Sequence, residues 1–193
     1  MAFVRLPKAV VMIVAILVTV GVAYILGVSA AGLVQKAWVK KSQAEKTESI
    51  LKQMGSNLAV GVALPDAELE DLAGNPVRLG EVTHEKSLVA FVSPDCGACK
   101  IQLQRYNKNV PSPADQSHFI VISDADPAEL ISLRDEYSLS CIFLVDLKGT
   151  YKSKLGVFTF PFNLVVTKAL VIDNIIPGVP EPDELEQVVR SNR

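Results

Sequence analysis

The chain has 193 residues, a formal net charge of −2 and 49% hydrophobic residues. Its positive and negative charges are mixed and form no basic stripe, which argues against nucleic acid as a partner. The apolar residues are concentrated near the N-terminus, and residues 60–193 have the length of one domain with a single core.

An uncharged apolar segment, residues 9–34, dominates the N-terminal part of the chain after a short tail, residues 1–8. As a helix, this segment would span roughly 39 Å, which is enough to cross a bilayer with some tilt. A signal peptide has a shorter apolar region, although residues 28–30 offer a cleavage site of small residues. We therefore predict one N-terminal transmembrane helix that serves as an anchor, with cleavage as the alternative.

The surroundings of this anchor bear on where the protein is located. Positive charges lie on both sides of the anchor and do not decide its orientation. A short N-terminal tail suits a signal anchor, so we expect a single-pass inner-membrane protein with its large domain on the periplasmic or extracytoplasmic side. Residues 35–58 are polar and rich in helix formers, which predicts a juxtamembrane helix or stalk before the domain at residues 60–193.

Small residues recur at every fourth position of the anchor, at Ala15, Thr19, Ala23, Gly27 and Ala31. Such a stripe lets a second helix approach closely, so one hypothesis is that the anchor self-associates or binds a partner helix. Small residues are also common in membrane spans that have no such role. The sequence leaves both interpretations open.

The rest of the chain alternates apolar runs with helix-forming segments. Residues 64–79 predict a β-hairpin that turns at residues 73–76. The later elements, in chain order, are a strand at 87–92, a helix at 100–108, a strand at 119–123, a helix at 127–137, a short strand at 141–145, one or two helical turns at 149–155, paired strands at 162–167 and 170–176, and a helix at 182–190. This order predicts an α/β fold in which helices flank a mixed central sheet.

Cys96 and Cys99 lie between the strand at 87–92 and the helix at 100–108. Two cysteines three positions apart at a helix start share one face and are close enough to form a disulfide. The unpaired N–H groups at the helix start favour a thiolate at Cys96. A thiolate with a second thiol in reach can exchange disulfides, so we predict that Cys96 and Cys99 are catalytic and form a redox-active disulfide.

Other readings of this spacing include half of a zinc site and a structural disulfide. A closed zinc site needs two further ligands, and Cys141, His84 and His118 are the only other cysteine and histidine residues. We therefore predict no metal and no organic cofactor. Cys141 lies in an apolar run and is interpreted as a buried hydrophobic residue, whereas the two histidines are expected at the surface or in the core.

The chain resembles the thioredoxin-like superfamily over residues 64–189. It is most similar to the membrane-anchored, extracytoplasmic TlpA/ResA-type thiol–disulfide oxidoreductases. The resemblance rests on the Asp-Leu-x-Gly-x-x-Val-x-Leu hairpin at residues 71–79, the strand followed by C-x-x-C, and Pro161 before a strand. The run at residues 92–100 is also similar to the methylamine dehydrogenase accessory proteins. The resemblance implies protein disulfides or dithiols as substrates and a redox partner at the membrane.

The resemblance also implies a substrate-binding segment. Pro161 would be a cis-proline beside the cysteine pair, and the backbone of Phe160 would bind a substrate strand by β-addition. Phe158, Phe160 and Phe162 alternate around Pro161, so in a strand they would share one face. They would form either an apolar collar beside Cys96 or part of the core.

Three positions depart from the family pattern. Ala90 replaces the buried acid of thioredoxins, and Gln102 replaces the glutamate usual in the TlpA/ResA branch. Neither side chain can accept the proton of the resolving thiol, so water or another group has to do so. Asp95 replaces the usual aromatic residue before the first cysteine. We expect Asp95 to be the helix N-cap, where it would compete with a Cys96 thiolate for the same N–H groups, or else a solvent-facing residue without influence.

Two other functions fit parts of the pattern. A peroxiredoxin-like thiol peroxidase is indicated by Ser93 three residues before Cys96, but Val89 stands where that family has a proline. A non-catalytic assembly or metal-chaperone module would use the same two sulfur atoms, although Sco-type copper delivery uses a wider cysteine spacing. We prefer the oxidoreductase, and its direction (reductase, oxidase or isomerase) stays open.

Overall fold

The computed structural model describes residues 58–193 continuously and, before them, residues 34, 35, 38, 41, 42, 45, 47–49, 51 and 52. The chain divides into two compact units, Met1–Lys46 and Thr47–Arg193, and the fold below belongs to the second. Within the described part of the chain, no helix is long and apolar enough to cross a membrane. The predicted anchor at 9–34, with its stripe of small residues, lies outside the described residues except for its last position.

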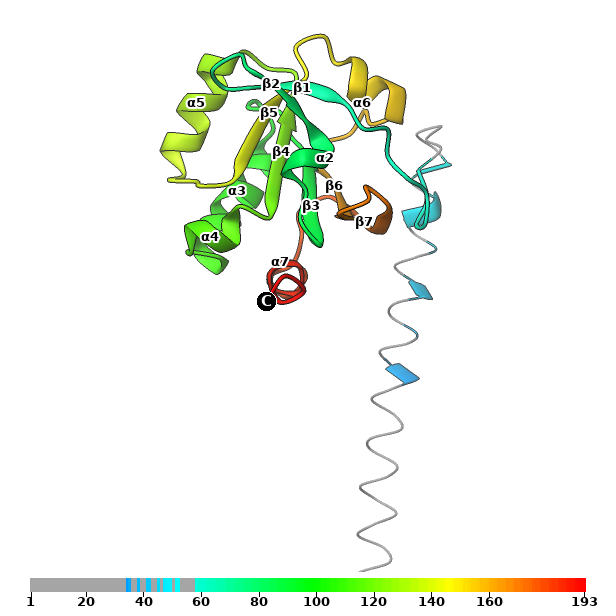
Figure 1. The fold of residues 1–193 in the computed structure, drawn as a ribbon. Coiled ribbons are helices and arrows are strands. Elements are labelled where there is room, and N and C mark those ends of the chain that lie inside the picture. The colour runs from blue at the N-terminus through cyan, green and yellow to red at the C-terminus, as the bar shows by residue number, and fades with distance from the viewer. Residues whose placement is uncertain are drawn as a thin grey trace, which may run out of the picture. The chain divides into compact units, whose positions relative to one another are not determined.

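A seven-stranded mixed sheet forms the centre of this fold, in the order β2-β1-β5-β4-β3-β6-β7 (Figure 1). Its strands are β1 (Glu68–Asp71), β2 (Pro76–Arg78), β3 (Lys86–Phe91), β4 (Phe119–Ser123), β5 (Ile142–Val145), β6 (Phe162–Thr167) and β7 (Ile172–Pro177). Strands β3, β4 and β5 are parallel, while β1 pairs antiparallel with β5 and β6 antiparallel with β3. The predicted α/β class, with a mixed sheet and an N-terminal hairpin, is confirmed.

Helices cover both faces of the sheet (Figure 1). Their bounds are α2 (Leu79–Val82), α3 (Gly97–Asn109), α4 (Pro113–Gln116), α5 (Pro127–Glu136), α6 (Thr150–Leu155) and α7 (Pro182–Arg190). Helices α3, α5 and α7 contribute buried side chains to one core, and α2 and α6 contribute to the other. We call these the α3-side core and the α6-side core.

The central strands fill both cores, because successive side chains of a strand point to opposite faces of the sheet. In β3, Leu88 and Ala90 belong to the α3-side core, whereas Val89 and Phe91 belong to the α6-side core. All four side chains are at most 1% exposed. A strand that is buried on both faces has a continuous apolar sequence, which is why runs of apolar residues predicted the central strands correctly.

Two single-turn helices, α2 and α4, were not predicted. Each has four residues, too few to show a helical period in the sequence. Helix α4 is stabilised by its N-cap, because the Ser112 side chain accepts a hydrogen bond from the Asp115 N–H. Helix α2 begins beside Asp66, whose carboxylate accepts a 2.9 Å hydrogen bond from the Gly80 N–H. The contact of α2 therefore comes from a residue 14 positions away, whereas that of α4 comes from the residue directly before the helix.

The turn of the N-terminal hairpin falls at residues 72–75, one residue earlier than predicted. The Asp71 carboxylate explains the shift, because it accepts hydrogen bonds from the Ala73 N–H at 2.8 Å and the Asn75 N–H at 2.9 Å. It also accepts one from the Asn75 side chain at 2.9 Å. Aspartate commonly closes turns in this way, by bonding to backbone N–H groups two or more residues ahead.

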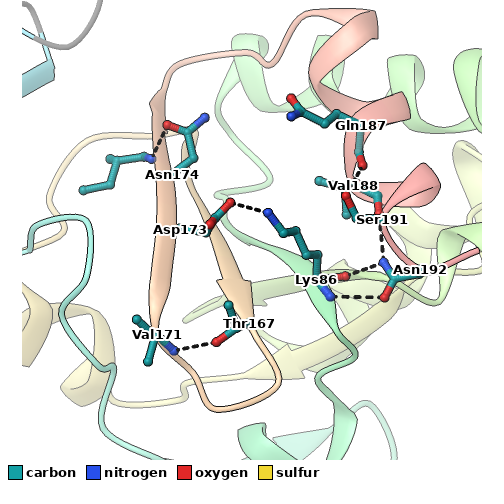
Figure 2. Close-up of polar contacts among 10 residues, drawn as sticks. Lys86, Thr167, Val171, Asp173, Asn174, Gln187, Val188, Ser191 and Asn192 are labelled. Carbon is teal, nitrogen blue, oxygen red and sulfur yellow. Dashed lines mark hydrogen bonds and ion pairs between the residues drawn. The ribbon is translucent and has the colours of Figure 1, made fainter.

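The end of α7 is fastened to the start of β3 (Figure 2). The Asn192 side chain accepts a hydrogen bond from the Lys86 N–H at 3.1 Å and donates one to the Lys86 carbonyl at 2.7 Å. It also donates to the carbonyl of Val188 at 2.8 Å. The Lys86 ammonium forms an ion pair with Asp173 of β7 at 2.6 Å. Lys86 thereby connects β3 with both α7 and β7.

Candidate redox site

Cys96 is the N-cap of α3, and its Sγ accepts a hydrogen bond from the Cys99 N–H at 3.2 Å. A sulfur at this position lies beside unpaired N–H groups and the positive end of the helix dipole, which stabilise a thiolate. The prediction that Asp95 is the N-cap is wrong. Asp95 is exposed and lies in the turn before the helix, where the Cys96 N–H donates to the Ser93 carbonyl at 3.1 Å. Helical geometry therefore starts only at Gly97.

The two thiols of the motif differ in their access to solvent. Both are free, but Cys96 is half-buried whereas the Cys99 side chain is 0% exposed. Burial, followed by its hydrogen bond with Cys96, raises the pKa of the Cys99 thiol to about 12. The pair is therefore asymmetric: Cys96 can meet a disulfide of another molecule, and Cys99 is placed to react with Cys96 alone.

The segment before β6 lies against this pair. The Cys96 thiol donates a hydrogen bond to the Phe160 carbonyl oxygen, with 3.6 Å between sulfur and oxygen. The peptide bond between Phe160 and Pro161 is cis, as the resemblance implied, and Pro161 is buried. The structure thus brings Cys96, Cys99, Phe160 and Pro161 together. The pairing of β3 with β6 places the ends of these two chain segments side by side.

The three phenylalanines around Pro161 do not share one strand face, so that prediction is wrong. Strand β6 begins only at Phe162, and the residues before it form bends instead of a strand. Phe162 is fully buried in the α6-side core, and Phe158 is 63% exposed. Phe160 is half-buried and contacts both cores. Of these three phenylalanines, only Phe160 therefore connects the two cores with the surroundings of Cys96.

Sequence reasoning missed a cation over the Phe160 ring. The Lys152 Nζ of α6 lies 5.0 Å from the centre of this ring. The same nitrogen forms an ion pair with Asp124, the residue after β4, at 2.5 Å. A lysine and an aspartate 28 positions apart carry no local motif, so the sequence held no signal for this contact.

The departures at Ala90 and Gln102 lie in the interior, where both side chains are 0% exposed. Ala90 belongs to the α3-side core and is the pairing partner of Asn163 on β6. Gln102 donates a hydrogen bond to the Asn163 side chain at 2.7 Å. The position of Gln102 was recognised from the sequence, but its partner was not, because no sequence pattern marks Asn163.

The remaining cysteine and the histidines stand apart from this chemistry. Cys141 is 6% exposed in the α3-side core, which confirms its interpretation as a buried hydrophobic residue. His84 and His118 lie near each other, with ring centres 4.6 Å apart, before the starts of β3 and β4. Cys96 follows the opposite end of β3. Among the residues described, no group of three or more His, Cys, Asp and Glu side chains is arranged to hold a metal ion.

A mixed sheet of this order, with a C-x-x-C pair at the start of the helix after β3 and a cis-proline before β6, defines a thioredoxin-like fold. Solved structures with this fold include a thiol:disulfide interchange protein from a Bacteroides species, with 21% identity, a TM-score of 0.55 and coverage of 69% of this chain and 90% of that chain. A secreted Mycobacterium tuberculosis disulfide oxidoreductase has 19% identity and a TM-score of 0.54, with 65% and 96% covered.

A protein named as a peroxidoxin shares the fold as well. The peroxidoxin BcpB from Mycobacterium tuberculosis has 16% identity and a TM-score of 0.58, with 71% of this chain and 99% of that chain covered. The family model of the AhpC/TSA family matches residues 60–175, more than half of the chain. The chain therefore belongs to the AhpC/TSA family, which supports a redox activity in general terms. No curated protein matches the sequence.

Proposed function

We propose that this protein is a membrane-anchored thiol–disulfide oxidoreductase of the TlpA/ResA type, which exchanges disulfides with extracytoplasmic protein partners through Cys96 and Cys99. One observation carries the proposal. The half-buried Cys96 thiol at the N-cap of α3 lies next to the buried Cys99 thiol. It donates a hydrogen bond to the backbone carbonyl of Phe160 at 3.6 Å. The first thiol is accessible to a partner, and the second is protected from it.

The exchange has two steps. The Cys96 thiolate attacks one sulfur of the partner disulfide, which forms a mixed disulfide and releases the other partner sulfur as a thiolate that takes up a proton. Cys99 then loses its proton to water and attacks the Cys96 sulfur. The second partner sulfur leaves and is protonated in turn. The partner gains two electrons and becomes a dithiol, while Cys96 and Cys99 lose two and become a disulfide; the reverse sequence oxidises a partner.

Burial of Cys99 makes the second step dependent on proximity. Its raised pKa keeps the thiol protonated near neutral pH, so it does not compete with Cys96 for an external disulfide. Attack on the mixed disulfide follows only because the two residues lie three positions apart at the start of the same helix. Ala90 and Gln102 carry no ionisable group, which leaves water as the proton acceptor in this proposal.

The segment of Phe160 and Pro161 would bind the partner. In the reduced protein, the Phe160 carbonyl accepts a hydrogen bond from the Cys96 thiol. Once Cys96 forms a mixed disulfide, it has no proton to donate and the carbonyl is free to accept an N–H of the partner chain. This is the backbone pairing by which an extended peptide adds to a strand. Extended protein segments that carry a disulfide are the substrate class that this arrangement suits.

A trapping experiment tests the proposal. The Cys99→Ser variant lacks the resolving thiol, so it should accumulate mixed disulfides between Cys96 and partner proteins, visible on non-reducing gels and released by dithiothreitol. The Cys96→Ser variant should trap none, and Cys141→Ser is the control for the third thiol. Equal trapping by Cys96→Ser and Cys99→Ser, or none by either, would refute exchange through this pair.

The location is a separate part of the proposal, supported by the uncharged segment at residues 9–34. The full-length protein should stay in the membrane fraction after alkaline carbonate extraction. Protease added to spheroplasts should degrade its C-terminal domain without lysis. Release by carbonate would contradict the anchor, and protection of the domain until lysis would place it on the cytoplasmic side.

A second candidate function is a thiol peroxidase, which the AhpC/TSA family match and the likeness to the peroxidoxin BcpB favour. Cys96 would reduce a peroxide, becoming a sulfenic acid as one oxygen is transferred and water or an alcohol leaves. Cys99 would then condense with it to a disulfide and release water. Peroxide consumption by the reduced protein at a rate well above that of free cysteine would support this function. A rate equal to that of free cysteine would exclude it.

A further inference from the structure

A pair of buried amides lies beneath the candidate redox site. Gln102 of α3 and Asn163 of β6 are both 0% exposed, in an otherwise apolar region of the interior. The Gln102 Nε2 donates to the Asn163 Oδ1 at 2.7 Å, and the Asn163 Nδ2 donates to the Gln102 Oε1 at 3.2 Å. The second Nε2 hydrogen of Gln102 is taken by the Tyr106 hydroxyl at 2.5 Å. Each amide therefore both donates to and accepts from the other.

The same network reaches the loop after β7. The two Asn163 Nδ2 hydrogens are shared among the Gln102 Oε1 and the carbonyls of Gly178 at 2.7 Å and Ile176 at 3.2 Å. The Gly178 N–H in turn donates to the Pro161 carbonyl at 3.0 Å. Gly178 is thus bonded to the chain on both sides of Phe162. The network joins α3, β6 and the loop after β7 at a single point in the interior.

The two amides sit next to the two halves of the candidate site. Gln102 follows Cys99 by three positions, so it lies one turn further along the same helix face. Asn163 follows Pro161 by two positions at the start of β6. The pair spans 61 positions of sequence and bonds the helix of the cysteines to the strand of the proline. Because amides do not ionise, this connection keeps its hydrogen bonds at every pH at which the thiols titrate.

We propose that Gln102 and Asn163 are positioning residues, which hold the Cys96 end of α3 in register with the partner-binding segment of Phe160 and Pro161. This inference rests on the proposed disulfide exchange. A buried hydrogen-bonded pair rigidifies the elements that it joins and specifies one arrangement of them. A partner chain has to be paired with Phe160 and bonded to Cys96 at the same time, so its reaction depends on this register. A disulfide without a flanking chain needs only Cys96.

Two matched substrates separate these requirements. The first is an extended peptide whose single cysteine is a mixed disulfide with thionitrobenzoate. The second is the same mixed disulfide of free cysteine. Attack by Cys96 releases the same coloured thiolate from both, so the ratio of the two second-order rate constants measures what the peptide backbone contributes. Dividing the rates cancels any change in the reactivity of the Cys96 thiol itself.

The test uses the variants Gln102→Met and Asn163→Leu, which keep the size of the side chain and remove its hydrogen bonds. Each should lower the peptide-to-cysteine ratio by about three- to tenfold, which corresponds to the net free energy of a typical hydrogen bond. The rate with the cysteine substrate should change less than about twofold. Either variant alone is sufficient if the other does not fold. The wild-type protein should react faster with the peptide.

Gln116→Met is the matched control. Gln116 is 1% exposed and its amide donates to the Val110 carbonyl at 2.8 Å and accepts from the Ser140 N–H at 2.6 Å. It lies in α4, outside the network of Gln102 and Asn163. This variant should lose thermal stability as the other two do and keep the peptide-to-cysteine ratio of the wild type.

The other outcomes separate failure of the positioning role from failure of the exchange reaction. If Gln102→Met and Asn163→Leu keep the wild-type ratio, or if Gln116→Met lowers it equally, the positioning role is wrong while the exchange reaction stands. If the wild-type ratio is one, there is no backbone contribution to position and the inference is also wrong. If the wild-type thiols react with neither substrate, the proposed function itself fails.

Discussion

The Lys152 ammonium lies 5.0 Å from the centre of the Phe160 ring and is held there by its ion pair with Asp124. A cation over an aromatic face contributes about 0.5–1 kcal/mol at exposed sites and more where water is excluded. The Lys152 side chain is 19% exposed, so part of this contact is shielded from solvent. The ring is held on one side by this cation, while the Phe160 carbonyl accepts the hydrogen bond from Cys96.

We expect Lys152→Met to slow exchange with the peptide substrate by about two- to fivefold, because the Phe160 segment loses its cation contact. Lys152→Arg should retain the wild-type rate, since a guanidinium can pair with Asp124 and stack on the ring. The rates follow from release of thionitrobenzoate under pseudo-first-order conditions. Equal rates for Met and Arg at this position would show that the contact has no bearing on the reaction.

The burial of the three thiols predicts the order in which they are alkylated. Cys96 is half-buried, whereas Cys99 and Cys141 are 0% and 6% exposed. A brief treatment of the reduced, folded protein with iodoacetamide should therefore modify Cys96 first and leave the other two until denaturant is added. Mass spectrometry of tryptic peptides identifies the modified residue. Modification of Cys141 as fast as Cys96 would contradict its placement in the α3-side core.

Burial of Cys141 also predicts a loss of stability at alkaline pH. It raises the pKa of this thiol from 9.0 to about 12, so above pH 9.0 the unfolded chain releases a proton that the folded protein keeps. The stabilisation is complete below the unfolded pKa and is lost as the pH rises toward the folded one. The slope is about 1.4 kcal/mol of unfolding free energy per pH unit for this thiol.

Urea unfolding of the reduced wild type and of Cys141→Ala between about pH 8 and about pH 11 measures this effect. The wild type should lose stability more steeply than the variant, so the difference between their unfolding free energies should fall with pH. Contributions from the other ionisable groups are common to both proteins and cancel. A difference that stays constant over this range would mean that the Cys141 thiol has the same pKa in the folded and the unfolded protein, which would contradict its burial.

The fastening of α7 to β3 predicts a stability role for Asn192 (Figure 2). Asn192→Ala removes hydrogen bonds to the Lys86 N–H, the Lys86 carbonyl and the Val188 carbonyl, and should lower the unfolding free energy by about 1–3 kcal/mol. Asn174→Ala is the matched control, because Asn174 is exposed and its side chain accepts a hydrogen bond from the adjacent Ile175 N–H without joining two elements. Its effect should be under about 0.5 kcal/mol in urea unfolding. Equal losses would refute the role of the C-terminal contact.

Local patterns predicted most of the fold. The continuous apolar run before the motif predicted β3, and Pro182 with two acidic residues after it predicted α7 with the bounds that the structure has. These features depend on neighbours in the sequence, and so they are readable there. The N-cap at Asp95 was misassigned because aspartate and cysteine side chains can both accept hydrogen bonds from the N–H groups of a first turn. Only the backbone conformation decides which of two consecutive residues precedes the first helical one.

The sequence by itself determined which chemistry we propose, because two cysteines three positions apart at a helix start need nothing beyond their own helix to form a candidate exchanging pair. The tertiary structure decided what surrounds that pair. The contacts of Cys96 with Phe160 and of Gln102 with Asn163 span 64 and 61 positions. They arise because β6 lies antiparallel beside β3, which brings Asn163 opposite Ala90. Strand order in a sheet results from the packing of the whole domain, and no local pattern of residues specifies it.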